Sequence, residues 1–325
     1  MASQLDQIRN PIRAEMDAFE PRFREAMRSS VPLLDRIMTY IVKRKGKQMR
    51  PMFVFFSSGL CGGIGDSSFR AASLIELLHT ATLVHDDVVD DSNLRRGFFS
   101  INALWKNKIA VLAGDYLLSR GLLLAVEHRE FDLLSIVSDA VRKMSEGELL
   151  QIEKARRLDI TEEVYFEIIS AKTASLIASC CATGASAAGA NAETVKRMHD
   201  FGLAVGIAFQ IKDDLLDFDD SGKTGKPRGG DIKEHKLTLP LIHALAKVDS
   251  TQKRFIINTV KNHSDDEARV SNVMDLIHTS GGIQYARQQM EAYREKAFAL
   301  LESFPDAVYK EGLIQLVRFT TERSH

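Results

Sequence analysis

The sequence predicts an all-α fold, organised as a single domain over residues 1–325. Gly and Pro are scarce, at 20 and 7 residues, whereas Ala, Leu, Glu, Lys and Arg are plentiful, and this composition favours helix. Apolar residues recur three and four positions apart over 74–88, 201–218 and 274–304, as on the buried face of a helix. The alternating pattern and turn dipeptides of a sheet protein do not occur.

Each expected element follows from the local composition. A basic segment at 45–51 introduces an apolar stretch that we expect to be helical. The periodic helix over 74–88 ends in acidic residues, and the segment 92–97 after it contains Arg and Gly, which predicts a loop. The basic segment 221–236 follows a periodic helix in the same way. Apolar periodicity continues on both sides of these loops, so the C-terminal helices, at about 268–325, belong to the same domain.

Composition excludes several classes of function. The apolar fraction is 45% and the charged fraction 27%, as in a soluble globular protein. A net charge of −1 gives no general attraction for nucleic acid or an anionic membrane. The N-terminus carries charges throughout and has no apolar signal core. Residues 173–192 are uncharged but too weakly apolar for a membrane span, so a buried helix of small residues is expected. We therefore expect a cytoplasmic protein with no transmembrane segment.

The cysteines support the same interpretation. Cys61, Cys180 and Cys181 show no metal-binding spacing, and adjacent cysteines do not readily bridge each other. Buried, reduced thiols are expected.

Two aspartate clusters of identical spacing stand 127 positions apart. Each is a D-D-x-x-D at the end of an apolar helical run, and the members are Asp86, Asp87 and Asp90, then Asp213, Asp214 and Asp217. On a helix the first and last aspartates share one face, where their charges repel unless a cation is bound. Carboxylates on two such faces, opposed across a cavity, suit Mg²⁺ shared with substrate phosphates. Two merely solvated helix ends are the alternative, which explains one cluster better than two in the same setting.

Basic residues follow both clusters. Arg95 and Arg96 come just after the first, and two guanidinium groups can hold diphosphate oxygens in pairs. The second is followed by a glycine-rich basic loop that contains Lys226 and can fold over a phosphate group. That loop lacks the Walker A spacing, and a solvated basic loop is its alternative.

A second anion site is expected near the start of the apolar helix after 45–51. Lys47 and Arg50 are three positions apart there, and a helix N-terminus with two cations attracts anions. His79 lies on the face of Asp86, two turns earlier, although a single histidine is more often a core residue. Gln210 lies about one turn before the second cluster. These parts support one metal-dependent diphosphate site and one metal-free site, the latter built from Lys47, Arg50, His79 and Arg96.

Two such sites suit the joining of two diphosphate substrates. An allylic diphosphate ionises when Mg²⁺ and cations stabilise the departing diphosphate. The double bond of a second substrate held beside it attacks the carbocation. Apolar helix walls exclude the water that would quench this cation.

The ordered motifs resemble those of the trans-isoprenyl diphosphate synthases, the polyprenyl synthetase family, and among them the octaprenyl or solanesyl type. The match covers about residues 40–245. A single D-D-x-x-D is a weak signal, whereas the whole set in this order is specific. The motifs are GKQMRP (46–51), LLHTATLVHDDVVDDSNLRRG (77–97), GDYLLSR (114–120), KTASL (172–176), FQIKDDLLD (209–217) and GKPRGGDIKEHKLTLP (225–240). The resemblance implies an antiparallel helical bundle around a central cavity, the isoprenoid synthase fold, and a homodimer.

Roles carry over to matching positions. The resemblance implies that Asp86, Asp90 and Asp213 ligate two or three Mg²⁺ ions, assisted by Asp87, Asp214 and Asp217. It implies that Arg95, Lys172, Lys226 and Lys236 bind the allylic diphosphate, and that Lys47, Arg50, His79 and Arg96 bind isopentenyl diphosphate. Thr173 and Gln210 would face the developing cation, and the departing diphosphate would take the final proton. Gln48 and His235 depart from the family pattern, which leaves the role of Lys236 open.

Product length is expected to follow the depth of an apolar tunnel below the first cluster. The resemblance implies that Ala81 and Thr82 control this length, and both are small here. The same helix then presents Leu78, Leu77 and Leu74, and Leu74 lies about 18 Å below Asp86 at roughly 1.5 Å per residue. A long all-trans product of about C30 to C40 is expected, used for quinone side chains and handed to a membrane. A short-chain farnesyl or geranylgeranyl diphosphate synthase is the alternative.

Three other classes of protein share some of these sequence features. A class I terpene cyclase normally carries a different second metal motif. A non-catalytic subunit of a heteromeric prenyl synthase usually loses aspartates, whereas all six are present here. A di-iron carboxylate bundle needs two internal E-x-x-H pairs, and the second such pair in this chain lies at its end.

Overall fold

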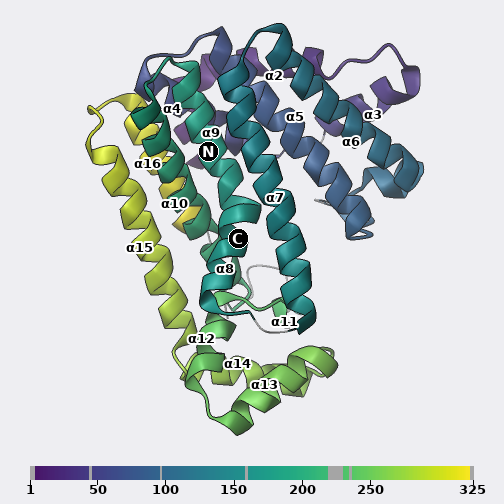
Figure 1. Cartoon of the computed structure of the whole chain (residues 1–325), viewed down its shortest axis with the longest axis vertical. Helices are drawn as coiled ribbons and strands as arrows, with labels where there is room; N and C mark the ends of the chain where they lie inside the picture. Colours follow the sequence, from purple (N-terminus) through teal and green to yellow (C-terminus); the bar gives the residue numbers. More distant parts are fainter. Residues whose placement is uncertain are drawn as a thin grey trace. The chain divides into compact units, whose positions relative to one another are not determined.

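A computed structural model describes residues 4–43, 46–95, 97–157, 160–218, 230–233 and 236–322 (Figure 1). The described chain is helical almost throughout, which confirms the all-α prediction. The described exception is a two-stranded antiparallel hairpin, β1 (Leu94–Arg95) and β2 (Phe98–Phe99), in which Leu94 pairs with Phe99 and Arg95 with Phe98. The hairpin falls in the segment that was expected to be a loop.

Contacts divide the chain into two compact units, each described by itself. Unit 1 consists of Met1–Val141, Ser179–His199 and Phe304–Leu313, and unit 2 of Arg142–Ala178, Asp200–Ser303 and Ile314–His325. The helices α7 (Phe131–Arg157), α9 (Ser175–Ala187), α10 (Ala192–Leu216) and α16 (Val308–Glu322) each continue from one unit into the other. The expectation of one domain over 1–325 stays a prediction.

Unit 1 is built around two long helices, α5 (Asp66–Val89) and α6 (Ile101–Glu127), which pack against each other. Leu77, Ala81 and Val84 of α5 share a core with Ala113 and Leu117 of α6. Ile37 and Met38 of α3, together with Met27 just after α2, complete this core. The helix α4 is buried on nearly all sides, as its continuous apolar sequence requires. The N-terminal elements are α1 (Gln4–Arg9), η1 (Asn10–Ile12), α2 (Arg13–Ala26), α3 (Pro32–Val42) and α4 (Met49–Cys61).

The helix α6 contains a sharp irregularity at Lys106. The backbone there has φ 73° and ψ 158°, although helical residues precede and follow it. This is a region that glycine occupies and that side chains rarely tolerate. Because position 106 is a lysine and not a glycine, the kink could not be predicted from the sequence.

Unit 2 has its own apolar core, formed by residues of α8, α10 and the helices from α12 to α15. Its short π-helical segment η2 follows α8 directly and is followed by α9, so the three form one continuous stretch of helix. The unit's elements outside the shared helices are α8 (Glu162–Ile169), η2 (Ser170–Ala174), α11 (Gly230–Lys233), α12 (Leu239–Lys247), α13 (Ser250–Asn262), α14 (Glu267–Thr279) and α15 (Gly282–Glu302).

Two stretches of the described chain are long and apolar enough to cross a membrane, judged by length and composition. They are Ile101–Glu127 and Glu162–Ala187. The most apolar window of Glu162–Ala187 is 72% buried, as in a core helix, and its α9 part is the buried helix of small residues that was expected. The window in Ile101–Glu127 is only 33% buried. The expected absence of a transmembrane segment stays a prediction.

The three cysteines are free; Cys180 and Cys181 are buried, as expected, whereas Cys61 is half-buried. Burial raises the pKa of the Cys61 thiol to about 11 and that of Cys181 to about 12. Thiols with such pKa values carry little thiolate near neutral pH and are poor nucleophiles.

Candidate active site

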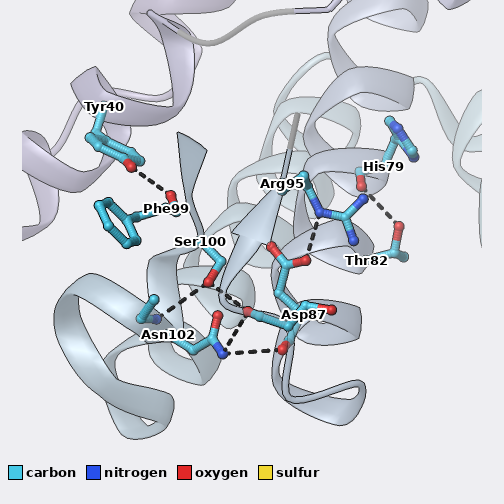
Figure 2. A network of polar contacts seen from close by, with 10 residues as sticks. Tyr40, His79, Thr82, Asp87, Arg95, Phe99, Ser100 and Asn102 are labelled. Carbon is cyan, nitrogen blue, oxygen red and sulfur yellow. Dashed lines mark hydrogen bonds and ion pairs between the residues drawn. The ribbon is translucent and has the colours of Figure 1, made fainter. Parts of the chain in front are cut away.

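The first aspartate cluster ends α5, and its second member differs from the other two. Asp87 is buried, at 3% exposure, whereas Asp86 is half-buried and Asp90 is exposed. The Nε of Arg95 donates to Asp87 Oδ1 at 2.6 Å (Figure 2). Burial raises the pKa of the Asp87 carboxyl, Arg95 lowers it and Asp90 raises it again. Asp87 therefore anchors the arginine that comes from the hairpin.

Further hydrogen bonds hold the residues on either side of the hairpin to each other and to the end of α5, and hold the hairpin itself to α3 (Figure 2). Asn102 donates its Nδ2 to the carbonyl oxygens of Asp87 and Ser92, at 3.2 Å each. Ser100 donates to the Ser92 carbonyl at 2.7 Å, and Tyr40 donates to the Phe99 carbonyl at 2.5 Å. These bonds fix the position from which Arg95 reaches Asp87. Arg96 lies outside the described residues.

The expected metal-free anion site belongs to unit 1 as well. Lys47 is exposed, and Arg50 lies in the first turn of α4, as the sequence predicted. Gln48 precedes this helix in the left-handed conformation, with φ 52°. The Nε of Arg50 is buried and has no hydrogen-bond partner within the described part of the chain. His79 is buried on α5, at 8% exposure.

One acidic neighbour of this site was not anticipated. Burial raises the pKa of the Cys180 thiol, Arg50 lowers it and Glu76 raises it again. Glu76 stands three residues before His79 on the same face of α5. The sequence shows this spacing, but nothing in it connects Glu76 to Arg50.

The second aspartate cluster ends α10 in unit 2, and, as in the first cluster, its middle aspartate is more buried than the other two. Asp214 is buried, at 5% exposure, whereas Asp213 and Asp217 are half-buried. The hydroxyl of Tyr165 donates to Asp214 Oδ2 at 2.7 Å, and the backbone N–H of Leu239 donates to the same oxygen at 3.2 Å. Leu239 is the first residue of α12, so Asp214 caps that helix from another element.

The amide of Gln210 joins this network. Its Nε2 donates to Asp214 Oδ1 at 3.3 Å, and its Oε1 accepts from the Thr173 hydroxyl at 3.2 Å. The structure therefore links Thr173 and Gln210, which were expected to face the developing cation, to Asp214, which was expected to assist the metal ligands. Tyr165 was missed by sequence reasoning, because a lone tyrosine eight positions before Thr173 carries no signal of its partner.

Lys172 and Thr173 are presented by the π-helical segment η2. π-helical turns inside α-helices are rare and often lie at functional sites. Lys172 Nζ lies 2.5 Å from Glu148 Oε2 and donates to Gln151 Oε1 at 3.2 Å, and both partners are on α7. Neither Glu148 nor Gln151 was singled out from the sequence, although their spacing of three places them on one helix face.

The basic loop after the second cluster lies largely outside the described residues, and Lys226 with it. The chain is described again from Gly230, where a side chain would begin 3.0 Å from Asp217 Oδ1. The described chain therefore resumes next to the second aspartate cluster. Lys236, just before α12, is exposed. Within the described ranges, no three His, Cys, Asp or Glu side chains gather as a metal site.

The expected chain-length residues lie along α5. Leu74, Leu77, Leu78 and Ala81 are all buried, at 1%, 0%, 5% and 0% exposure. Leu77 and Ala81 belong to the core shared with α6. Thr82 is half-buried, and its hydroxyl donates to the His79 carbonyl at 2.8 Å (Figure 2).

Comparison with known proteins matches this chain over nearly its whole length. The family described as polyprenyl synthetase matches residues 31–277. The octaprenyl diphosphate synthase of Escherichia coli is 35% identical over 320 residues, which cover 98% of this chain and 99% of that protein. A short chain isoprenyl diphosphate synthase of Methanothermobacter thermautotrophicus is 32% identical, with 98% and 99% covered.

A solved structure shows the same fold. It is a polyprenyl synthase from Caulobacter crescentus CB15, complexed with calcium and isoprenyl diphosphate. It is 34% identical, covers 99% of this chain and 98% of its own, and has a TM-score of 0.88. The helical fold, the ordered motifs and the relatives agree, and the chain belongs to the polyprenyl synthetase family of prenyl-transferring enzymes.

Proposed function

We propose that this enzyme condenses isopentenyl diphosphate head-to-tail with an allylic diphosphate and makes a long-chain all-trans polyprenyl diphosphate. The observation that carries the proposal is a difference in burial that both aspartate clusters share. In each, the second carboxylate is buried and held by protein donors, while the first and third are more exposed. A merely acidic, solvated helix end has no reason to repeat this arrangement.

The donor chemistry of the outer aspartates fits Mg²⁺. Asp86 with Asp90, and Asp213 with Asp217, each supply hard carboxylate oxygens one helical turn apart, and Asp87 stands beside the first pair. We propose that these residues hold two or three Mg²⁺ ions. A bound divalent ion would neutralise charge on the departing diphosphate. The calcium complex of the Caulobacter enzyme supports a divalent metal in this family.

The protein's own groups supply the remaining requirements in our proposal. Lys172 and Arg95 bring positive charge to the allylic diphosphate, together with Lys226 and Lys236. Thr173 and Gln210 present two hydrogen-bonded oxygens, and such electron-rich atoms stabilise a positive charge nearby. Lys47, Arg50, His79 and Arg96 bind isopentenyl diphosphate. The buried carboxylate of Asp214 holds the Gln210 amide in one orientation.

The length of the product is the finer part of the proposal. Relatives named for long products and relatives named for short ones both match this chain. The small residues Ala81 and Thr82 below the first cluster favour a product of about C30 to C40, as used for quinone side chains. We propose a cytoplasmic enzyme whose product passes to a membrane.

We also propose that the enzyme is a homodimer whose partner covers α6. That helix exposes six large aliphatic side chains, each between 40% and 54% exposed, more than a solvated helix normally shows. A helix that binds a membrane surface is rich in Lys and Arg on its polar face, whereas α6 mixes both signs and the chain has a net charge of −1. This favours a second copy. The six residues are Leu104, Val111, Leu112, Leu122, Leu123 and Val126.

Sedimentation tests the dimer. Leu112→Glu with Leu123→Glu is expected to convert the dimer to monomer, whereas Val308→Glu, at an equally exposed residue of α16, is not. A wild-type monomer would contradict the proposal, and flotation of that monomer with lipid vesicles would assign the face to a membrane.

A product ladder tests the activity. The purified chain is incubated with Mg²⁺, isopentenyl diphosphate and each allylic primer, and the dephosphorylated products are sized by chromatography. Products of about C30 or longer are expected, and Asp213→Asn is expected to abolish them while the exposed Asp265→Asn does not. If chain elongation stops at shorter products, the condensation reaction stands, but the enzyme is a short-chain synthase and not a long-chain one. Absence of condensation by the chain alone contradicts the proposal and favours a partner-dependent subunit.

A further inference from the structure

Two side chains of α7 converge on the ammonium group of Lys172. Glu148 Oε2 lies 2.5 Å from Lys172 Nζ, and Gln151 Oε1 accepts from the same nitrogen at 3.2 Å. A lysine ammonium has three N–H donors. With two donors directed to α7, the orientation of the third is restricted as well.

The backbone makes this meeting possible. Gly147 directly precedes Glu148, and a Cβ at Gly147 would lie 2.8 Å from the Ala171 Cβ and 3.1 Å from the Lys172 N. A side chain at that position would push α7 away from η2. The π-helical turn of η2 and the glycine of α7 together bring Glu148 and Gln151 within reach of Lys172.

We propose that Glu148 and Gln151 are positioning residues for Lys172, and that the allylic diphosphate replaces Glu148 as the counter-ion of this ammonium group. The inference rests on the proposed function, in which Lys172 binds that diphosphate. Gln151 carries no charge and keeps its hydrogen bond when the ligand binds. Glu148 holds the ammonium in the ligand-free enzyme and competes with the diphosphate for it.

The neighbouring ion pair on α7 provides a reference. Arg142 and Glu146 pair at 2.7 Å, with side chains 57% and 61% exposed, and such solvated pairs contribute little. Lys172 and Glu148 are 39% and 31% exposed, so their pair is less screened. The Lys172–Glu148 contact also joins two separate elements, η2 and α7, whereas Arg142 and Glu146 lie one turn apart on the same helix.

Binding of a non-ionising substrate analogue tests the competition. The probe is farnesyl thiodiphosphate with Mg²⁺, and its Kd is measured by calorimetry on the full-length enzyme. Glu148→Gln keeps the shape and a possible hydrogen bond but removes the competing charge. We expect it to tighten binding roughly three- to tenfold. Glu146→Gln removes the same charge two residues away without touching Lys172, and we expect no change.

A double-mutant cycle separates positioning from general electrostatics. In a Lys172→Met background, Glu148→Gln is expected to lose its effect on Kd. Gln151→Leu removes an acceptor without changing charge, and we expect it to weaken binding about two- to fivefold in the wild type but not in Lys172→Met. Thermal melts confirm that each variant is folded.

The outcomes distinguish this inference from the function on which it rests. Unchanged or weaker binding in Glu148→Gln contradicts the inference, as does an equal effect in the Lys172→Met background. Unchanged binding in Lys172→Met itself contradicts the proposed role of Lys172 in the diphosphate site, whatever Glu148 does.

Discussion

The hydroxyl of Tyr165 donates a 2.7 Å hydrogen bond to the carboxylate of Asp214, and both residues are 5% exposed. Asp214 also accepts from Gln210 and from the first backbone N–H of α12. A buried carboxylate is stable only when such donors surround it. The second aspartate of this cluster therefore acts as a structural centre, and Asp87 takes the same place in the first cluster through Arg95.

Removing the Tyr165 hydroxyl tests this role. Tyr165→Phe keeps the ring against Phe166 but takes one donor from a buried carboxylate. We expect the free energy of unfolding to fall by about 1–3 kcal/mol, measured by chemical denaturation. Tyr293→Phe, in another ring packed on Phe166, is the control and is expected to change stability by less. Equal losses in the two variants would show that the Tyr165–Asp214 bond does not contribute.

The Asp87–Arg95 pair leads to a second prediction. Arg95→Ala leaves a buried carboxylate without its guanidinium partner, and we expect a loss of about 2 kcal/mol because Arg95 itself is partly exposed. Asp87→Asn removes the buried charge, so adding Arg95→Ala to it is expected to cost less than Arg95→Ala alone. Denaturation of the four proteins gives the coupling energy. Strictly additive losses would mean that the two side chains do not stabilise each other.

Backbone strain at Lys106 predicts a stabilising substitution. Its φ of 73° and ψ of 158° suit glycine, and a side chain there costs about 1–3 kcal/mol. Glycine also gains freedom in the unfolded chain, so Lys106→Gly is expected to stabilise by a net amount of about 1 kcal/mol. The exposed Lys108→Gly in the regular part of α6 is expected to destabilise by about 1 kcal/mol. A loss of stability in both variants would contradict the strain.

The prediction of helices succeeded because periodicity and composition are local properties. The segment 74–88 lies within α5, and 201–218 falls in α10 and the residues that follow it. The hairpin at Leu94–Phe99 was missed because two-residue strands are too short for any alternation to appear. The kink at Lys106 was missed because its usual signal, glycine, is absent.

The residues of the candidate site could be predicted where they belong to one sequence motif. They could not be predicted where the site depends on contacts between separate elements. Both D-D-x-x-D clusters could be found, since i and i+4 spacing places carboxylates on one face. The burial of the second aspartate in each cluster could not be predicted. It depends on Tyr165, Leu239 and Arg95, which reach these aspartates from other elements. For the same reason Glu148 was not connected with Lys172.

The pH dependence of stability is expected to include His243 of α12. Burial lowers the pKa of His243, Lys247 lowers it further and Glu162 raises it. The unfolded chain then binds a proton more readily than the folded one below the ordinary value of 6.5, so this contribution is present above pH 6.5 and is lost as the pH falls. His243→Phe keeps a ring stacked on Tyr285 and is expected to reduce the loss of stability between about pH 7 and 5. Denaturation across that range measures it, with the exposed His278→Phe as the control. If the free energy of unfolding of His243→Phe changes with pH as steeply as that of the wild type, His243 does not contribute to the pH dependence.

Product length gives the last prediction, at two adjacent positions of α5. Ala81 is fully buried in the core with Ala113 and Leu117, so Ala81→Tyr is expected to shorten the product at a cost of about 1–3 kcal/mol from overpacking. Thr82 is half-buried, and Thr82→Phe is expected to shorten the product with little loss of stability.

Thr80→Phe is the matched control for these two variants, because Thr80 is equally half-buried but points to the opposite side of the helix. Chromatography of the dephosphorylated products, together with thermal melts, separates a blocked tunnel from a damaged core. If Ala81→Tyr and Thr82→Phe both keep the wild-type product ladder, the tunnel does not pass this part of α5, and the length must be set by residues of other helices. If Thr80→Phe shortens the product as much as Thr82→Phe, the effect comes from distortion of α5 and not from an aromatic ring placed in the path of the growing chain.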